Sequence, residues 1–264
     1  MKHLLSIVVC LIIALLANAQ VELIEIESAI QISNNLDTTP DSGTIRWNGS
    51  DFEGWNGTSW VSLTGGNTPS VADISGNEYR TTKIGEQVWM AENLKTSKYN
   101  DGQAIPRVIP NAVWLSLDSG AYSWYDNDQS ADEELGKLYN WYVVETGKIC
   151  PSGWRVPSIL DFEILVENLG YHIGRQLKAI GSRYWTHPND TSLDKVNFNA
   201  RGSGLRSSID GAFKHIDRNF IMWFQDEESA SEGMNLLLTD TEPFHWFHDN
   251  KKQMGASIRC IQNN

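Results

Sequence analysis

Two cysteines, Cys150 and Cys260, place the strongest single constraint on this chain of 264 residues, because a bond between them would close a loop that spans 110 positions. Whether they are bonded depends on the compartment in which the protein matures. Disulfides persist where conditions are oxidising, whereas cytosolic thiols stay reduced. The N-terminal residues, which carry any export signal, therefore bear directly on the fold.

The first 19 residues have the organisation of a secretory signal peptide. Lys2 precedes an apolar run from Leu4 to Leu16, and Ala17 and Ala19 supply the small residues of a cleavage site. The run is shorter than the about 20 apolar residues that a membrane span needs. We therefore predict cleavage near Ala19–Gln20, a secreted or cell-surface protein, and no transmembrane segment.

Cleavage would remove Cys10, the third cysteine, and leave Cys150 and Cys260 as a pair. An even cysteine count in an exported chain predicts one disulfide. In the chain-entropy model, closing so long a loop removes unfolded-state entropy worth roughly 4–5 kcal/mol. Two buried free thiols are the alternative.

Cleavage also removes Lys2, which leaves 20 basic and 33 acidic residues and a net charge of −13. Non-specific nucleic-acid binding needs clustered Lys and Arg to neutralise phosphates, and nothing here exceeds the pair Lys251–Lys252. The charge balance therefore argues against nucleic acid and against anionic membrane surfaces as partners.

The mature chain divides into three sections, which are an N-terminal β stalk and meander at 20–64, a linker at 65–74 and a C-terminal domain at 75–264. Residues 21–32 alternate between apolar and polar side chains in the manner of a strand. Two Trp-Asn-Gly units begin at Trp47 and Trp55. Asn-Gly favours tight hairpin turns, so the meander is predicted as three short strands with turns at 48–49 and 56–57.

The C-terminal domain mixes strands and helices without alternating them, which predicts an α+β fold with few helices, many short strands and long loops. A hairpin is predicted over 79–84 and 87–90. The strongest helix signal lies at 159–169, where Ser158 is a natural N-cap, Asp161 follows three positions later and Gly170 ends the pattern. A shorter helix is predicted at 172–180, with short strands and polar loops from residue 184 onward.

Four separated stretches give the C-terminal domain a recognisable signature. They are Gly76–Leu94, Gly136–Trp141, Cys150–Ser158 and Gly255–Ile261. In order and spacing they resemble the Fibrobacter succinogenes major paralogous domain, a family frequent in secreted bacterial proteins, over about residues 75–262. Residues 43–64 more weakly resemble a segment found in bacterial surface and fibre-like proteins.

The resemblance implies a relative of the C-type-lectin-like fold, in which a Gly-Trp-Arg-Val-Pro turn leads into a helix and a cysteine near the C-terminus closes the domain. It also implies an exported protein with an adhesive or carbohydrate-related role. One departure bears on function. The family often carries a Trp-Trp-Ser-Ser-Thr-Glu word where this chain has Met222–Glu228.

Tryptophans among polar loop residues are the candidate ligand-facing side chains, because an indole ring can stack on a sugar while neighbouring acids bond its hydroxyls. Core packing is the alternative and is the usual fate of tryptophan. Two acidic clusters could add Ca²⁺, although solvated acidic loops are the more common reading of such runs. The candidate binding residues are Trp114, Trp124, Asp126, Asp128, Trp223, Asp226, Glu228 and Trp246.

Other chemistry has weaker signals. His245 and His248 are three residues apart in a segment that favours strand or loop, so they would face opposite sides instead of chelating a metal together. The chain has no nucleophile elbow, zinc-protease helix motif, P-loop or dinucleotide-binding motif. Glycoside hydrolysis requires only a carboxylate pair, which a sequence cannot locate.

Three functional hypotheses follow. The leading one is a non-enzymatic binding or adhesion protein that engages a glycan or a surface protein through the loops of regions 105–134 and 203–250. The second is an extracellular polysaccharide-acting enzyme that uses a carboxylate pair. The third is a structural fibre component in which the N-terminal segment drives homo-oligomer formation.

Overall fold

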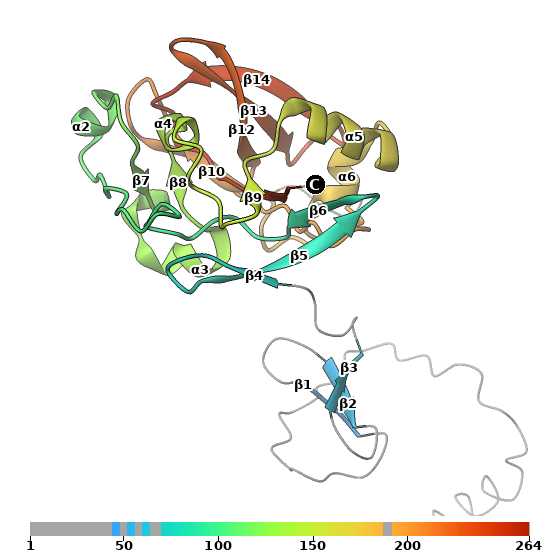
Figure 1. Cartoon of the computed structure of the whole chain (residues 1–264). Coiled ribbons are helices and arrows are strands. Elements are labelled where there is room, and N and C mark those ends of the chain that lie inside the picture. Colours follow the sequence, from blue (N-terminus) through green and yellow to red (C-terminus); the bar gives the residue numbers. More distant parts are fainter. Residues whose placement is uncertain (1–43, 48–51, 56–59, 64–69, 187–191, 264) are drawn as a thin grey trace, which may run out of the picture. The chain divides into compact units, whose positions relative to one another are not determined.

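The computed structural model describes residues 44–47, 52–55, 60–63, 70–186 and 192–263. The chain divides into two compact units, Met1–Asn67 and Thr68–Asn264 (Figure 1). The predicted signal peptide, the strand at 21–32 and the turns at 48–49 and 56–57 lie outside the described residues. Within the described part of the chain, no helix is long and apolar enough to cross a membrane.

The N-terminal unit contains the three predicted strands. They are β1 (Ile45–Trp47), β2 (Phe52–Trp55) and β3 (Trp60–Ser62), which form one antiparallel sheet in the order β1-β2-β3. The meander predicted from the Trp-Asn-Gly units is therefore confirmed at the level of its strands.

A five-stranded sheet joins the two ends of the C-terminal unit. Its order is β4 (Ser70–Ala72), β5 (Glu78–Ile84), β6 (Gln87–Met90), β15 (Ile261–Gln262) and β9 (Trp154–Arg155). The predicted β5–β6 hairpin is confirmed, and Ile261 of the last strand pairs with both Trp89 and Arg155. β4 lies inside the segment predicted as a linker and pairs with β5, so ordered structure starts before residue 75.

The second large sheet is antiparallel and consists of β12 (Asn219–Ser229), β13 (Glu232–Thr239) and β14 (Trp246–Lys251). β12 has 11 residues and β13 has 8, so the prediction of short strands beyond residue 184 is wrong here. Side chains from Phe220 to Phe224 are all buried, because odd and even positions enter different hydrophobic clusters. A strand covered on both faces reads as an unbroken apolar run and hides its period of two.

Shorter elements complete the unit. Two small antiparallel sheets pair β7 (Tyr122–Ser123) with β8 (Leu138–Tyr139) and β10 (Ser203–Arg206) with β11 (Phe213–Ile216). The helices are α2 (Asn111–Leu115), η1 (Tyr125–Asn127), η2 (Gln129–Ala131), α3 (Asp132–Leu135), α4 (Trp141–Glu145), α5 (Ile159–Leu169) and α6 (Ile173–Leu177). Short helices and many strands give the α+β composition that the sequence predicted.

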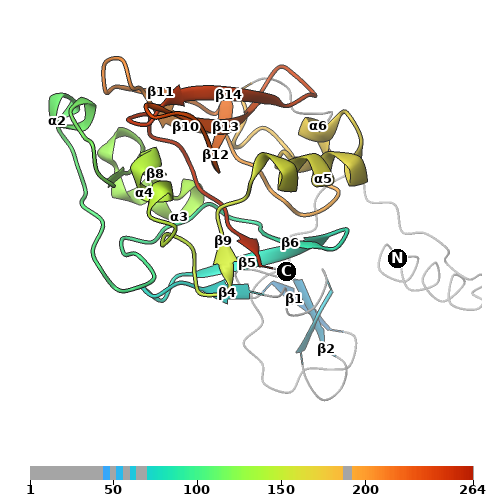
Figure 2. The same cartoon turned by 45° about the horizontal axis from the view of Figure 1, so that its top comes forward.

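The long helix α5 begins and ends where the sequence predicts. Ser158 accepts from the Asp161 backbone N–H, the Asp161 side chain accepts from the Ser158 N–H, and Gly170 follows with φ 85°. The next helix, α6, is shorter than predicted and stops at Leu177. Beyond it the chain turns extended, and the Ala179 N–H bonds to Ala200 O at 2.8 Å. Figure 2 shows α5 between the two large sheets.

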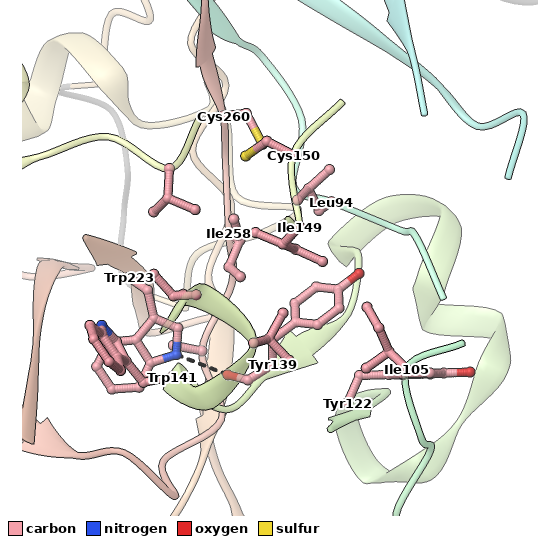
Figure 3. Close-up of a cluster of buried hydrophobic side chains, with 14 of the residues drawn as sticks. Leu94, Ile105, Tyr122, Tyr139, Trp141, Ile149, Cys150, Trp223, Ile258 and Cys260 are labelled. Carbon is pink, nitrogen blue, oxygen red and sulfur yellow. Dashed lines mark hydrogen bonds between the residues drawn. A yellow bond between two sulfur atoms is a disulfide. The ribbon is translucent and has the colours of Figure 1, made fainter. Parts of the chain in front are cut away.

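Two hydrophobic clusters form the interior. One surrounds the predicted disulfide, Cys150–Cys260, which is present (Figure 3). In the same cluster the Trp223 indole donates to Tyr139 O at 2.9 Å. The other cluster lies between α5, α6 and the β12–β14 sheet and includes Phe162, Phe224 and Leu236.

Candidate functional site

The four candidate tryptophans lie in different environments. Trp114 and Trp223 are fully buried, and Trp124 retains 7% of its surface, whereas Trp246 is 50% exposed. The prediction of a common exposed face is therefore wrong for three of them. Their rings lie in the interior, and two of their indole groups also find acceptors there, because Trp114 donates to Gln253 O at 2.6 Å and Trp223 donates to Tyr139 O.

The candidate acids do not converge on one point. Asp128 accepts from the Ser130 N–H at the start of η2, and Asp226 accepts from the Ile159 N–H at the start of α5 at 2.8 Å. Both carboxylates thus stabilise helix N-termini. Asp126 and Glu228 are exposed. Across the described residues no group of three or more His, Cys, Asp or Glu side chains is placed to hold a metal ion.

A group of aromatic side chains, four of them exposed and Phe244 half-buried, lies where α5 gives way to α6 and along the adjoining segment 244–248. We call it the aromatic rim, and it consists of Tyr171, His172, Phe244, Trp246 and His248. Tyr171 is 69% exposed, and its ring centroid lies 5.1 Å from that of Phe244. The His172 and Phe244 rings are 5.0 Å apart and inclined by only 30°. The rim therefore presents flat apolar surface and imidazole groups to solvent.

Strand β14 is oriented by the side chains on its buried face. Phe247 contacts Phe162 of α5 and Phe224 of β12, with ring centroids 5.8 and 5.7 Å apart. His245, which precedes the strand, packs on the same Phe162 ring at 5.3 Å, and burial lowers the pKa of its imidazole. Trp246 and His248 alternate along the strand with His245 and Phe247, and both are exposed. His245 and His248 therefore point to opposite sides, as the sequence indicates.

A buried lysine fixes the loop that leads into the rim. Lys178 is 2% exposed, and its ammonium donates to Thr239 O at 3.1 Å and to Glu242 O at 3.4 Å. The same ammonium lies 5.2 Å from the Trp185 ring centroid, and burial lowers its pKa. These bonds hold residues 239–242 in place. They therefore fix the direction in which the next segment, 243–248, continues from the loop.

A close backbone contact with α6 also holds the same loop in place. A Cβ atom on Gly174 of α6 would lie 2.6 Å from Phe244 O and 2.8 Å from Pro243 O. Only glycine permits α6 to approach the loop so closely. The rim is thus built on a fixed support, a property that favours recognition because little side-chain and loop freedom is lost on binding.

The sequence did not single out Tyr171, His172 or Phe244. Tyr171 follows Gly170, the residue that ends α5. An aromatic residue directly after a helix C-cap is a sequence feature that could have identified Tyr171 as a candidate. Phe244 follows Pro243 in a segment whose evident signal is its histidines. Their juxtaposition depends on a contact between segments that are more than 70 positions apart, which no local pattern encodes.

One carboxylate pair does meet in the fold. Glu145 and Glu227 both contact the ammonium of Lys252, whose side chain is 3% exposed and lies 4.5 Å from the Trp141 ring centroid. Burial alone would lower the pKa of Lys252, but its bonds to Glu227 and Glu145 outweigh burial and raise it. The Lys252 ammonium forms an ion pair with each carboxylate, which is a structural role.

The recognised stretches mostly build the interior. Asn93, Trp141, Cys150 and Arg259 are all buried.

A family model described as the Fibrobacter succinogenes major domain matches residues 82–262, more than half of the chain. No curated protein and no solved structure matches the chain.

Proposed function

The chain belongs to the Fibrobacter succinogenes major domain family, and from that premise we propose that it is a secreted or cell-surface binding protein that engages glycan through the aromatic rim. The single observation that carries the proposal is a solvent-exposed aromatic surface on a fixed support. Trp246 and Tyr171 are 50% and 69% exposed, although large aromatic side chains are usually buried. Sugar rings stack on such faces.

Polar groups beside the rim suit hydroxyl recognition. His172 and His248 are exposed imidazoles that can donate and accept hydrogen bonds, and the carboxylate of Glu242 is exposed at the end of the clamped loop. An apolar platform edged by a few fixed polar groups is the usual composition of a small-molecule site. The proposal includes a C-type-lectin-like fold, supported by the turn of β9 into α5 and by the closing bond of Cys260.

Export and binding without turnover are parts of the same proposal. The signal peptide pattern supports secretion. The Glu145–Glu227 pair is an acidic arrangement similar to that of a hydrolase, but glycoside hydrolysis requires one carboxyl group that holds a proton for the leaving oxygen. Here the ammonium of Lys252 contacts both carboxylates, an arrangement that supports a structural role for the pair and binding without hydrolysis.

A glycan array probed with the chain from Gln20 onward, with calcium and with chelator, tests the proposal. We expect binding that survives chelation and falls at least tenfold in Trp246→Ala and in Tyr171→Ala. Ile209→Ala is the matched control, because Ile209 is 87% exposed and lies outside the rim. No binding to any glycan on the array, either with calcium or with chelator, would reject glycan binding. Binding that is equally weakened by the control would reject the rim as the site.

A further inference from the structure

Residues 243–245 connect two stretches of chain that hydrogen bonds hold in place. Before them the Lys178 ammonium binds the carbonyl groups of loop 239–242, and after them β14 pairs with β13. Among the residues that the structure describes, none forms a backbone hydrogen bond with 243–245. The position of this segment therefore depends on packing, against Gly174 of α6 and through the ring of His245.

The His245 imidazole packs against two phenylalanine rings. Its centroid lies 5.3 Å from that of Phe162 on α5 and 5.2 Å from that of Phe247 on β14. The Nδ1 atom of the ring is buried and has no hydrogen-bond partner. A neutral imidazole tolerates this place, because Nδ1 can remain unprotonated while Nε2 carries the hydrogen.

Charged groups on the surrounding elements are engaged elsewhere or lie toward solvent. The carboxylates of Asp161 and Asp226 are bound, the first by Arg155 and the second by the backbone at the start of α5. Burial, and not a neighbouring charge, lowers the pKa of His245. The other titratable groups of α5, α6, the loop and β14 near this ring are exposed or half-buried, and they are Glu163, Glu167, His172, Arg175, Asp240, Glu242, His248 and Asp249.

Protonation changes what this place must accommodate. The imidazolium carries a hydrogen on both nitrogens, so Nδ1 becomes a buried donor without an acceptor. It also brings a positive charge against the Phe162 ring in a site shielded from water. Both changes raise the free energy of the packed conformation, whereas a conformation that exposes the ring to water accommodates the charge.

We propose that acid releases the aromatic rim, because a proton on His245 detaches residues 243–245 from α5 and moves Phe244 away from its ring partners. Those partners are Tyr171 and His172, whose ring centroids lie 5.1 and 5.0 Å from that of Phe244 in the packed conformation. The inference rests on the proposed function and adds its regulation, since a glycan held on the intact rim at neutral pH dissociates in acid.

The ordinary pKa of a histidine sets the direction and the size of the effect. The detached ring has a pKa of about 6.5, so the packed conformation is fully favoured above that pH and loses its advantage as pH falls below it. At pH 5 a free imidazole is charged about thirty times as often as it is neutral, which limits the shift to about thirtyfold. Such a shift converts a detached population of about 3% at neutral pH into about half of the molecules.

Nuclear magnetic resonance of the chain from Gln20 onward, at about pH 7.5 and pH 5.0, tests the proposal without any ligand. We expect the nuclear Overhauser contact between the Phe244 and Tyr171 rings to fall at least twofold at the lower pH. His245→Phe keeps an aromatic ring that cannot be protonated, so its contact should be equal at both pH values. His248→Phe is the matched control, because it replaces an exposed imidazole of β14, and it should retain the fall.

Glycan-array binding at the same two pH values connects this contact with the proposed function. We expect at least twofold weaker binding at pH 5.0 in the unsubstituted protein and no such loss in His245→Phe. Ring contacts that are equal at both pH values in the unsubstituted protein would overturn the inference, and so would a loss in acid that persists in His245→Phe. An array without binding at pH 7.5 would reject the proposed function, while the ring contacts would still decide whether His245 controls the rim.

Discussion

The Arg259 guanidinium donates from Nε to the Asn93 side-chain oxygen at 2.7 Å, although 166 positions separate the two residues. Arg259 is 1% exposed, and its other nitrogens bond to Phe198 O and Asn199 O, so carbonyl groups surround a buried cation. Burial lowers the pKa of Arg259 to about 9. The first and last of the recognised stretches are thus joined by one polar contact inside the core.

We expect Asn93→Ala to lower the free energy of unfolding by about 2–3 kcal/mol, because it leaves the buried Nε–H of Arg259 and the carbonyl of Leu135 without their partner. Urea denaturation followed by circular dichroism measures the change. Arg80→Ala removes an exposed ion pair with Glu92 and should cost less than about 1 kcal/mol. Equal losses in the two variants would contradict the assignment.

Replacing both Cys150 and Cys260 by Ala should lower the free energy of unfolding by about 2–5 kcal/mol, since the closed loop restricts the unfolded chain. Thermal or urea unfolding of the oxidised protein and the double variant gives the difference. The denatured, unreduced mature protein should show no reactive thiol, and two thiols per chain would disprove the bond.

The half-buried carboxyl of Asp194 should make stability depend on pH. Burial raises the pKa of Asp194 to about 6, although its bond from the Asn199 N–H and the nearby Arg259 oppose the shift. The ordinary value in an unfolded chain is about 3.9. The folded state therefore binds the proton more tightly, and this contribution to stability is present below about pH 4 and is lost as pH rises through about 6.

Asp194→Asn removes the titration and should remove this slope. Relative to the unsubstituted protein, we expect the variant to gain on the order of 2–3 kcal/mol between pH 4 and pH 7. Urea midpoints measured in steps of half a pH unit would reveal it. Parallel pH profiles for the two proteins would show that Asp194 titrates alike in the folded and unfolded states.

Lys178→Met should loosen the loop before β14 while keeping the apolar length of the side chain. Thr239 O and Glu242 O lose their donor, so amide hydrogen exchange over 239–246 should accelerate at least tenfold, and glycan binding at the rim should weaken with it. Lys214→Met, which breaks an exposed pair with Asp210, is the control. Unchanged exchange in Lys178→Met would remove the lysine as the support of the rim.

Local signals predicted the elements whose ends are defined by neighbouring residues. The capping box of Ser158 and Asp161 and the stop at Gly170 correctly predicted α5, and the two short segments 79–84 and 87–90 were correctly predicted as the β5–β6 hairpin. The helix at 172–180 was predicted too long because the Ala179 N–H bonds to Ala200 O, and Ala200 is remote in sequence. In that position a long-range backbone bond outweighs helix propensity.

The candidate site was less accessible to sequence reasoning. Polar neighbours around Trp114, Trp124 and Trp223 suggested exposure, but a tryptophan in a polar loop can still point inward, and these three do. Trp246 was identified correctly as exposed. Its companions Tyr171 and Phe244 were not, because they come together only when the end of α5 meets residues 239–244 over Gly174.

The sequence by itself determined what short spacings and covalent chemistry encode, which here are the family, the cysteine pair, the meander strands and the capped helix. The tertiary structure decided which side of each strand is buried and which distant aromatic rings share a surface. The physical reason is that capping and strand alternation act over a few residues, whereas burial depends on every layer that packs against a residue. A tryptophan therefore carries no local mark of whether it will bind a sugar or fill the core.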